Sequence, residues 1–185
     1  MNRIVFIDRD GVICKEKHLL SKKEDLELLP QTEEAIKKLN EHNYRVVVVT
    51  NQPVVARGLC TEEEVIEINK HLEQLLLEKG AKLDRIYYCP HHPKGVIAKY
   101  TIECECRKPK PGMLLQAKKD FGLETLSESY MIGDQIGDIL AGERAGCKTI
   151  LVETGYGGKG GFNDATPHYI TKDLYEAVTQ IILKK

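Results

Sequence analysis

Five short segments of the chain are mostly apolar and rich in β-branched or aromatic residues, and polar residues follow them. These segments are 4–7, 45–50, 85–89, 130–133 and 149–153. Apolar runs of this length, without the strict alternation of a half-exposed strand, are typical of strands that are buried on both faces of a sheet. The pattern therefore predicts five buried strands.

Between and after these runs, apolar residues recur every three or four positions, as they do on one face of a helix. The segments with this spacing are 33–42, 62–79, 111–121, 136–145 and 174–183. Thr61 and Glu64 form a capping box that predicts the start of the second helix, and Gly146 predicts the end of the fourth. Strands that alternate with helices predict a mostly parallel sheet with helices on both sides, which is a three-layer, Rossmann-like α/β fold.

Composition narrows the class of protein further. The chain has 185 residues, 42% of them hydrophobic, which suits a single domain over residues 1–185. Because the net charge is -1 and no basic block occurs, we do not expect nucleic acid as a partner. No apolar run approaches the roughly 20 residues of a membrane span, nor the length of a signal peptide. We therefore expect a cytoplasmic protein without membrane contact, and a monomer.

Polar residues follow the predicted strands at the edge of the sheet where α/β folds bind ligands. In chain order they are Asp8, Arg9, Asp10 and Gly11; Thr50, Asn51 and Gln52; Arg107 and Lys108, after a long loop; and Asp134, with Asp138 four residues later. Each group alone is weak evidence, since an Asp-x-Asp pair after a strand is a common turn and Thr or Asn there is often a cap. Their order along the chain makes the set informative.

This ordered set resembles the haloacid dehalogenase (HAD) superfamily of phosphotransferases over nearly the whole chain. The resemblance implies a phosphatase in which Asp8 attacks phosphorus and becomes an aspartyl-phosphate, while Asp10 protonates the leaving oxygen and later activates water. A phosphate dianion admits a carboxylate nucleophile only when cations neutralise both, so Asp8, Asp134 and the backbone carbonyl of Asp10 are expected to bind Mg²⁺. Lys108 and Thr50 are expected to hold the phosphoryl oxygens.

Three further features lie around this predicted site. Gly11 lets the chain turn away without a side chain that would block the phosphate. Asp138 is expected to orient Lys108 or a metal-bound water, or else to be only a charge at a helix terminus. The glycine-rich segment 155–161 lacks the Gly-Lys-Ser/Thr ending of a P-loop, so we expect a flexible loop at the rim.

Cysteine and histidine cluster in the loop 89–107. A Cys-x-His pair and a Cys-x-Cys pair contribute four candidate ligands for tetrahedral Zn²⁺, namely Cys89, His91, Cys104 and Cys106. His92 could replace His91, although the spacing favours His91, and the competing interpretation is three free thiols in a reducing cytosol. Four protein ligands leave no open position, so we expect a structural zinc that fixes Arg107 and Lys108 over the phosphate pocket.

The zinc loop narrows the resemblance to a branch without a cap domain that includes heptose bisphosphate and histidinol phosphatases. It implies hydrolysis of a small sugar bisphosphate, with the 7-phosphate of D-glycero-D-manno-heptose 1,7-bisphosphate as the expected group. The resemblance also implies contacts to the sugar or its second phosphate from Arg107, Asn51 and Gln52. At one position the chain departs from the pattern, because Gln135 stands where the heptose enzymes commonly have lysine. Histidinol phosphate is the alternative substrate, and phosphatases of nucleotides or polynucleotide ends fit the near-neutral charge less well.

A hypothesis from another class is a zinc-stabilised module that binds phosphorylated ligands, or another protein, without catalysis. Damage to the nucleophile, the acid, the lysine or a metal-binding carboxylate would favour it. All of these residues are present in the chain, which favours an enzyme.

Overall fold

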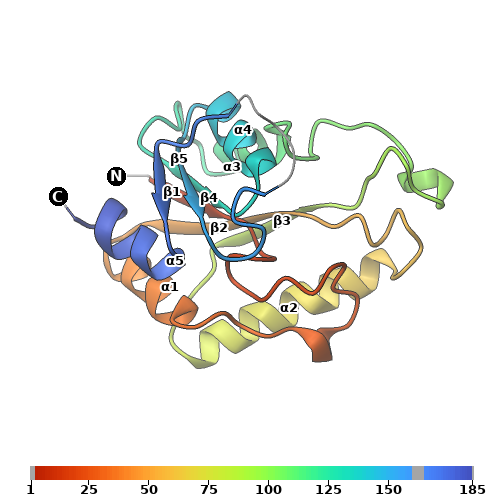
Figure 1. The fold of residues 1–185 in the computed structure, drawn as a ribbon, viewed down its shortest axis with the longest axis horizontal. Coiled ribbons are helices and arrows are strands. Elements are labelled where there is room, and N and C mark those ends of the chain that lie inside the picture. Colours follow the sequence, from red (N-terminus) through yellow and green to blue (C-terminus); the bar gives the residue numbers. More distant parts are fainter. Residues whose placement is uncertain (1–2, 160–164, 185) are drawn as a thin grey trace.

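The computed structural model describes residues 3–159 and 165–184. Helices cover both faces of a six-stranded sheet (Figure 1). In chain order the elements are β1 (Ile4–Ile7), the short 3-10 helix η1 (Lys23–Asp25), α1 (Thr32–Glu41), β2 (Arg45–Asn51), α2 (Glu62–Glu78), β3 (Arg85–Cys89), the 3-10 helix η2 (Ala98–Tyr100), α3 (Gly112–Asp120), β4 (Tyr130–Gly133), α4 (Ile136–Ala145), β5 (Lys148–Val152), β6 (Tyr169–Thr171), α5 (Leu174–Glu176) and the π-helix η3 (Ala177–Ile182).

The strand order is β3-β2-β1-β4-β5-β6, and every neighbouring pair is parallel. The chain therefore builds outward from β1 to β3 and then returns to the other side of β1 with β4. Open α/β sheets bind ligands beyond the strand ends at such a point of reversal. This arrangement confirms the predicted three-layer α/β fold.

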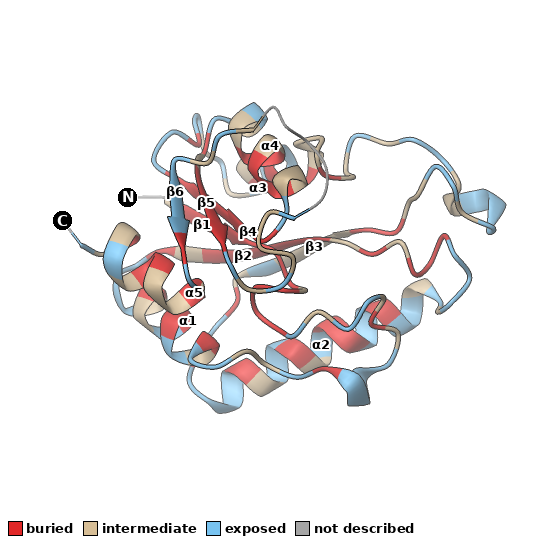
Figure 2. Ribbon diagram, viewed as in Figure 1, coloured by how far each residue is buried: buried red, intermediate tan, exposed pale blue. Residues whose placement is uncertain are grey.

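Successive side chains of the central strands point to opposite faces of the sheet, as strand geometry requires. From β1 and β2, Val5, Ile7, Val46 and Val48 pack in one core with the helices α1, α2 and α5, whereas Ile4, Phe6, Val47 and Val49 pack in a second core with α3 and α4. The central strands β1, β2, β4 and β5 are mostly buried, whereas the helices are buried only along their inner side (Figure 2). Packing on both faces thus fixes the sheet, and it thereby fixes the positions of the polar residues at the strand ends.

The predicted helix signals are confirmed in detail. The side chain of Thr61 accepts a hydrogen bond from the amide of Glu64 at 3.1 Å, and the Glu64 carboxylate accepts from the Thr61 amide at 2.7 Å. Gly146 ends α4 in the left-handed conformation, with φ of 82°. Observed bounds of the predicted strands and of the first four helices differ from the predictions by one residue at most.

Two elements at the end of the chain differ from the predictions. The strand β6 was not predicted, because it has only three residues and two of them, Tyr169 and Ile170, are exposed at the sheet edge. The predicted helix 174–183 begins as α5 but continues as the wider turns of η3. In the described part of the chain, no helix is both long and apolar enough to cross a membrane.

Candidate active site

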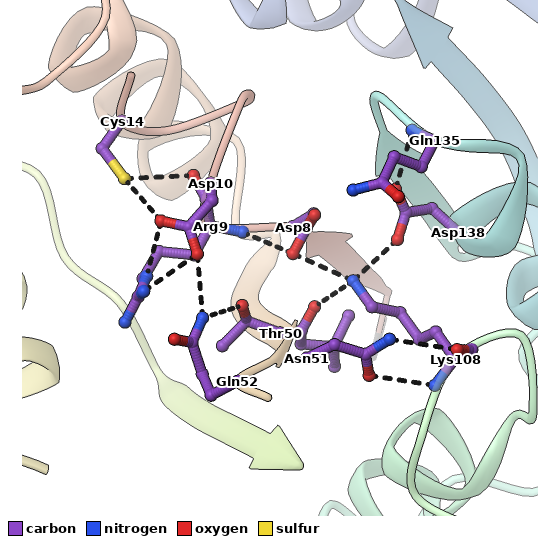
Figure 3. A network of polar contacts seen from close by, with 11 residues as sticks. Asp8, Arg9, Asp10, Cys14, Thr50, Asn51, Gln52, Lys108, Gln135 and Asp138 are labelled. Carbon is purple, nitrogen blue, oxygen red and sulfur yellow. Dashed lines mark hydrogen bonds and ion pairs between the residues drawn. The ribbon is translucent and has the colours of Figure 1, made fainter. Parts of the chain in front are cut away.

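The carboxyl ends of β1, β2 and β4 meet the loop before α3 at a cleft of about 400 Å³. This is an ordinary size for a small-molecule site. Figure 3 shows the polar network that lines it, in which the predicted residues of the different strand ends point toward one another. The residues predicted from the sequence thus come together at one edge of the sheet.

Lys108 occupies the centre of this network. Its Nζ lies 2.9 Å from Asp8 Oδ1 and 2.7 Å from Asp138 Oδ1, and it donates to the carbonyl oxygen of Val49 at 2.7 Å. Burial lowers the pKa of Lys108, but the charges of Asp138 and Asp8 outweigh burial and raise it above the usual value. The ammonium therefore stays charged, and all three of its protons have acceptors.

Three buried carboxylates, those of Asp8, Asp134 and Asp138, bring ligand atoms within 4.8 Å of one another. Burial is the largest cause that raises the pKa of Asp8 to about 7 and that of Asp134 to about 8; repulsion from neighbouring carboxylates adds to it, and the charge of Lys108 opposes it. Asp134 Oδ1 is buried and has no hydrogen-bond partner among the described residues. An orphaned oxygen in an all-oxygen cluster of carboxylates fits a hard divalent cation such as Mg²⁺.

The glycine-rich segment contributes to this cluster in a way the sequence did not predict. The amide of Tyr156 donates to Asp134 Oδ2 at 2.7 Å, and the amide of Gly158 donates to the Asp134 carbonyl at 2.7 Å. A Cβ on Gly155 would lie 2.2 Å from Asp134 Oδ2, and one on Gly11 would lie 2.3 Å from it. The start of the segment is therefore packed on the carboxylate, while residues 160 and 161 of the predicted flexible loop lie outside the described residues.

The side chain of Asp10 turns away from the other carboxylates toward Arg9. The Arg9 Nε and Nη2 donate to its two oxygens at 3.2 and 2.9 Å, and Gln52 Nε2 donates at 2.8 Å (Figure 3). Burial would raise the pKa of Asp10, but the neighbouring Arg9 charge holds it below the usual value. Only the backbone carbonyl of Asp10 was predicted to bind metal. The side chain, which is bonded to Arg9 and Gln52, is left for the predicted acid and base role.

The polar side chains at the end of β2 hold other residues of the site. Asn51 exchanges two hydrogen bonds of 3.0 Å with the backbone of Lys108, so its amide fixes the lysine in place. Gln52 Nε2 also donates to Thr50 Oγ1 at 2.8 Å. Both amides were predicted to contact substrate, and both are already bonded to neighbouring site residues. The Thr50 hydroxyl accepts this bond and keeps its proton to donate.

The four predicted zinc ligands lie together. The sulfur of Cys106 is 3.0 Å from that of Cys89, 3.2 Å from that of Cys104 and 3.5 Å from His91 Nδ1. Three thiols and an imidazole that converge on one point form the donor set of a structural Zn²⁺ site. His92 lies outside the cluster, and its Nδ1 accepts from the Lys94 amide at 3.0 Å, so the geometry favours His91.

Comparison with known proteins adds the family. A family model described as HAD-hydrolase-like matches residues 105–177. A D-glycero-D-manno-heptose-1,7-bisphosphate 7-phosphatase of Chlorobaculum tepidum is 38% identical over 188 residues, which cover 98% of this chain and 94% of the relative. The chain belongs to the haloacid dehalogenase-like hydrolases. It is a phosphatase that hydrolyses phosphoric monoesters, and phosphatases of this family use Mg²⁺.

Two further similarities extend over most of this HAD phosphatase. A D-glycero-beta-D-manno-heptose-1,7-bisphosphate 7-phosphatase of Pasteurella multocida is 39% identical and covers 84% of each chain. The crystal structure of a D,D-heptose 1,7-bisphosphate phosphatase of B. bronchiseptica, complexed with magnesium and phosphate, has a TM-score of 0.86 at 29% identity and covers 99% of both chains. The predicted resemblance and the HAD fold are thereby confirmed.

Two residues that contact the site of this HAD phosphatase were given no role by the sequence, Arg9 and Asn69. Arg9 is fully buried, and its Nη1 donates to Asn69 Oδ1 of α2 at 2.9 Å. The sequence carried one signal for Asn69, because it interrupts the apolar stripe of α2 between Val65 and Leu72. For Asp138, the contact with Lys108 favours the orienting role over that of a mere helix-terminal charge.

Proposed function

We propose that this HAD phosphatase removes the 7-phosphate of D-glycero-D-manno-heptose 1,7-bisphosphate through a phosphorylated Asp8. The observation that carries the mechanism is the buried Asp8 carboxylate, held 2.9 Å from the Lys108 ammonium in the cleft. The substrate is supported by the names of relatives that match 98% and 84% of the chain.

In the first step, a carboxylate oxygen of Asp8 forms a bond to phosphorus as the bond from phosphorus to the sugar oxygen breaks. Asp10 donates a proton to that oxygen, so the sugar leaves as a neutral alcohol. Lys108 and Thr50 donate hydrogen bonds to the phosphoryl oxygens, where negative charge builds up in the transition state. Asp138 keeps Lys108 in line with Asp8.

In the second step, the carboxylate of Asp10 takes a proton from a water molecule, whose oxygen attacks phosphorus. The bond between phosphorus and Asp8 breaks, which releases inorganic phosphate and restores the free carboxylate. Asp8, Asp134 and the Asp10 carbonyl would hold Mg²⁺, which supplies the positive charge that lets an anionic nucleophile meet an anionic phosphate. One residue thus handles the proton in both steps.

The zinc loop belongs to the proposal as a scaffold. A Zn²⁺ bound by Cys89, His91, Cys104 and Cys106 would fix the chain just before Arg107 and Lys108. Two contacts outside the cluster also hold this part of the chain. The hydroxyls of Tyr88 and Tyr100 both donate to the carboxylate of Glu62 at the start of α2, at 2.9 and 2.6 Å.

The second phosphate of the substrate is assigned to two arginines on the cleft wall. Arg57 and Arg107 both line the cleft, and in the described part of the chain neither forms an ion pair with a carboxylate. Burial and the nearby charge of Arg57 lower the pKa of Arg107. Arg107 Nη1 donates to the His91 carbonyl at 3.1 Å, but two nearby guanidinium groups without a carboxylate partner favour a dianionic ligand, because its charge relieves their repulsion.

A panel of substrates tests the proposed function. The values of kcat/KM are to be compared for both anomers of heptose 1,7-bisphosphate, fructose 1,6-bisphosphate and histidinol phosphate, in the presence of Mg²⁺. We expect one heptose anomer to give the highest value. A higher value for histidinol phosphate would replace the substrate, and an absence of phosphate release from every substrate, including 4-nitrophenyl phosphate, would contradict the catalytic role of Asp8.

A further inference from the structure

Arg9 is the largest side chain that the described structure buries completely. It follows the nucleophile directly and is not among the residues that line the cleft, and the mechanism above does not use it. Removing a guanidinium from water is unfavourable unless its charge and its donors are satisfied. The partners of Arg9 therefore indicate what the residue is for.

The guanidinium binds Asp10 in a fork. Nε donates to Asp10 Oδ1 at 3.2 Å and Nη2 donates to Asp10 Oδ2 at 2.9 Å. Two parallel bonds from a planar group fix both the position and the rotation of a carboxylate, which a single bond from lysine cannot do. Gln52 and the Cys14 thiol contact the same carboxylate at 2.8 and 3.4 Å and restrict it further.

The remaining edge of the guanidinium is anchored to α2. Arg9 Nη1 donates to Asn69 Oδ1 at 2.9 Å, and Asn69 is only 6% exposed. A polar residue in the apolar stripe of a helix is unfavourable unless it is hydrogen-bonded, and this bond to Arg9 supplies that compensation. A chain of contacts therefore runs from the middle of α2 through Arg9 to the carboxylate that handles the proton.

We infer that Asn69 and Arg9 are positioning residues, through which α2 aims the Asp10 carboxyl at the leaving-group oxygen. The inference rests on the proposed role of Asp10 as the acid. A purely structural ion pair would stabilise the loop after β1 without regard to the substrate. A positioning role makes a further prediction, because the need for an acid depends on the leaving group.

A sugar alkoxide is a poor leaving group and must be protonated as it departs, whereas 4-nitrophenolate departs without help. Because kcat/KM reports the steps up to departure of the leaving group, the second-step role of Asp10 does not enter it. Loss of alignment should therefore lower kcat/KM for an alkyl phosphate and leave it much less changed for 4-nitrophenyl phosphate. The ratio of the two values is the readout.

The experiment measures this ratio for the full chain with Asn69→Leu, which keeps the size of the side chain but removes the acceptor. We expect kcat/KM for fructose 1,6-bisphosphate, or for the best alkyl phosphate of the wild type, to fall about 10- to 100-fold. For 4-nitrophenyl phosphate the fall should be below about 3-fold, an order-of-magnitude bound for a step without acid assistance. Arg9→Lys, which keeps the charge and loses the fork, should show the same selective loss, and Asn69→Asp, which keeps an acceptor, should recover most of the ratio.

Leu76→Ala is the matched control, since it removes packing on the same helix face without touching Arg9. It should lower the melting temperature and leave the ratio unchanged. Equal losses for both substrates in Asn69→Leu, or no loss for either, would overturn the inference. If Asn69→Leu does not fold, Asn69→Ser is judged by the same ratio. The alkyl phosphate in this test is the one that the wild-type enzyme hydrolyses best. The test therefore remains valid even when the heptose substrate has been assigned wrongly.

Discussion

At the scale of single residues, the environment of Lys108 explains why its charge can be kept at the centre of a buried site. Its three protons are shared among Asp8, Asp138 and the carbonyl oxygen of Val49, and its backbone is pinned by Asn51. The side chain therefore has one orientation before any substrate arrives. Preorganisation of this kind is the main source of electrostatic catalysis, because no reorganisation is needed at the moment of reaction.

Replacement of the nucleophile is the first prediction at this scale. In Asp8→Asn the amide cannot form the acyl phosphate, so we expect kcat to fall by at least about 10⁴-fold. The amide is isosteric and can still accept from Lys108, so the circular dichroism spectrum should be unchanged. Residual kcat above that bound, in protein that folds normally, would show that another group attacks phosphorus.

The second prediction concerns the phosphate that does not react. In Arg107→Met and in Arg57→Met, KM for the sugar bisphosphate should rise about 10-fold, because a charge-assisted hydrogen bond to the second phosphate is lost. KM for 4-nitrophenyl phosphate should change by less than about 2-fold, since this substrate has no second phosphate. Lys110→Met is the control, because Lys110 pairs with Glu105 on the same loop. Equal effects on both substrates would contradict the assignment of these arginines.

At the scale of elements, the segment between β3 and α3 has little regular structure of its own and extends away from the sheet (Figure 1). Three sets of contacts compensate for this. The Cys and His cluster closes its base, Glu62 binds Tyr88 and Tyr100, and the amides of Val96 and Ile97 donate to the Ala56 carbonyl at 2.7 and 3.0 Å. Without such contacts, the entropy cost of ordering a long loop would not be offset, and Arg107 would not be held in place.

The third prediction tests the metal in this loop. Purified, dialysed protein should contain about one zinc per chain, as four protein ligands to one ion require. Cys104→Ser should lose that zinc, melt at a lower temperature and have a lower kcat/KM, because the ion stabilises the loop that carries Lys108. Cys60→Ser, which changes a half-buried thiol outside the cluster, should keep the metal. Full activity of a metal-free protein would contradict the scaffold role.

 At the scale of the whole molecule, the site forms because β1 and β4 are neighbours in the sheet although they lie far apart in the chain. The paired residues Phe6 and Met131 are 125 positions apart in the chain and adjacent in the sheet. This pairing places Asp8, after β1, beside Asp134, after β4. The carboxylates repel each other until a cation joins them, so metal binding and the folded arrangement of the two strands support one another.

The fourth prediction follows from this coupling. Mg²⁺ at about 100 times its dissociation constant should stabilise the fold by about 2.7 kcal/mol and raise the melting temperature by about 5–10 °C. In Asp134→Asn most of this shift should disappear, because the variant removes both the ligand and the repulsion that the ion relieves. Thermal melts with and without Mg²⁺, at constant ionic strength, measure the effect. An equal shift in the variant would place the ion elsewhere.

Much of the architecture was predictable, because buried strands and amphipathic helices leave a periodic pattern in the sequence. The strand β6 left none, since its residues Tyr169 and Ile170 face solvent at the sheet edge. The main residues of the site were predictable from their positions after the strands. The hydrogen bonds that join these residues to one another were not predictable from the sequence. The bond from Arg9 to Asn69 depends on where α2 packs, and the same guanidinium holds the Asp10 side chain.

The contact of Gly155 with Asp134 has a consequence for changing the specificity of this enzyme. Neighbouring positions such as Tyr156 and His18 line the cleft, so they are natural targets for a library of variants. Gly155 has a φ of 60°, and any Cβ there would lie 2.2 Å from Asp134 Oδ2. Randomising it would displace the Asp134 carboxylate, the proposed Mg²⁺ ligand, before it altered any contact with substrate. A productive library therefore keeps this glycine fixed and varies the residues on either side of it.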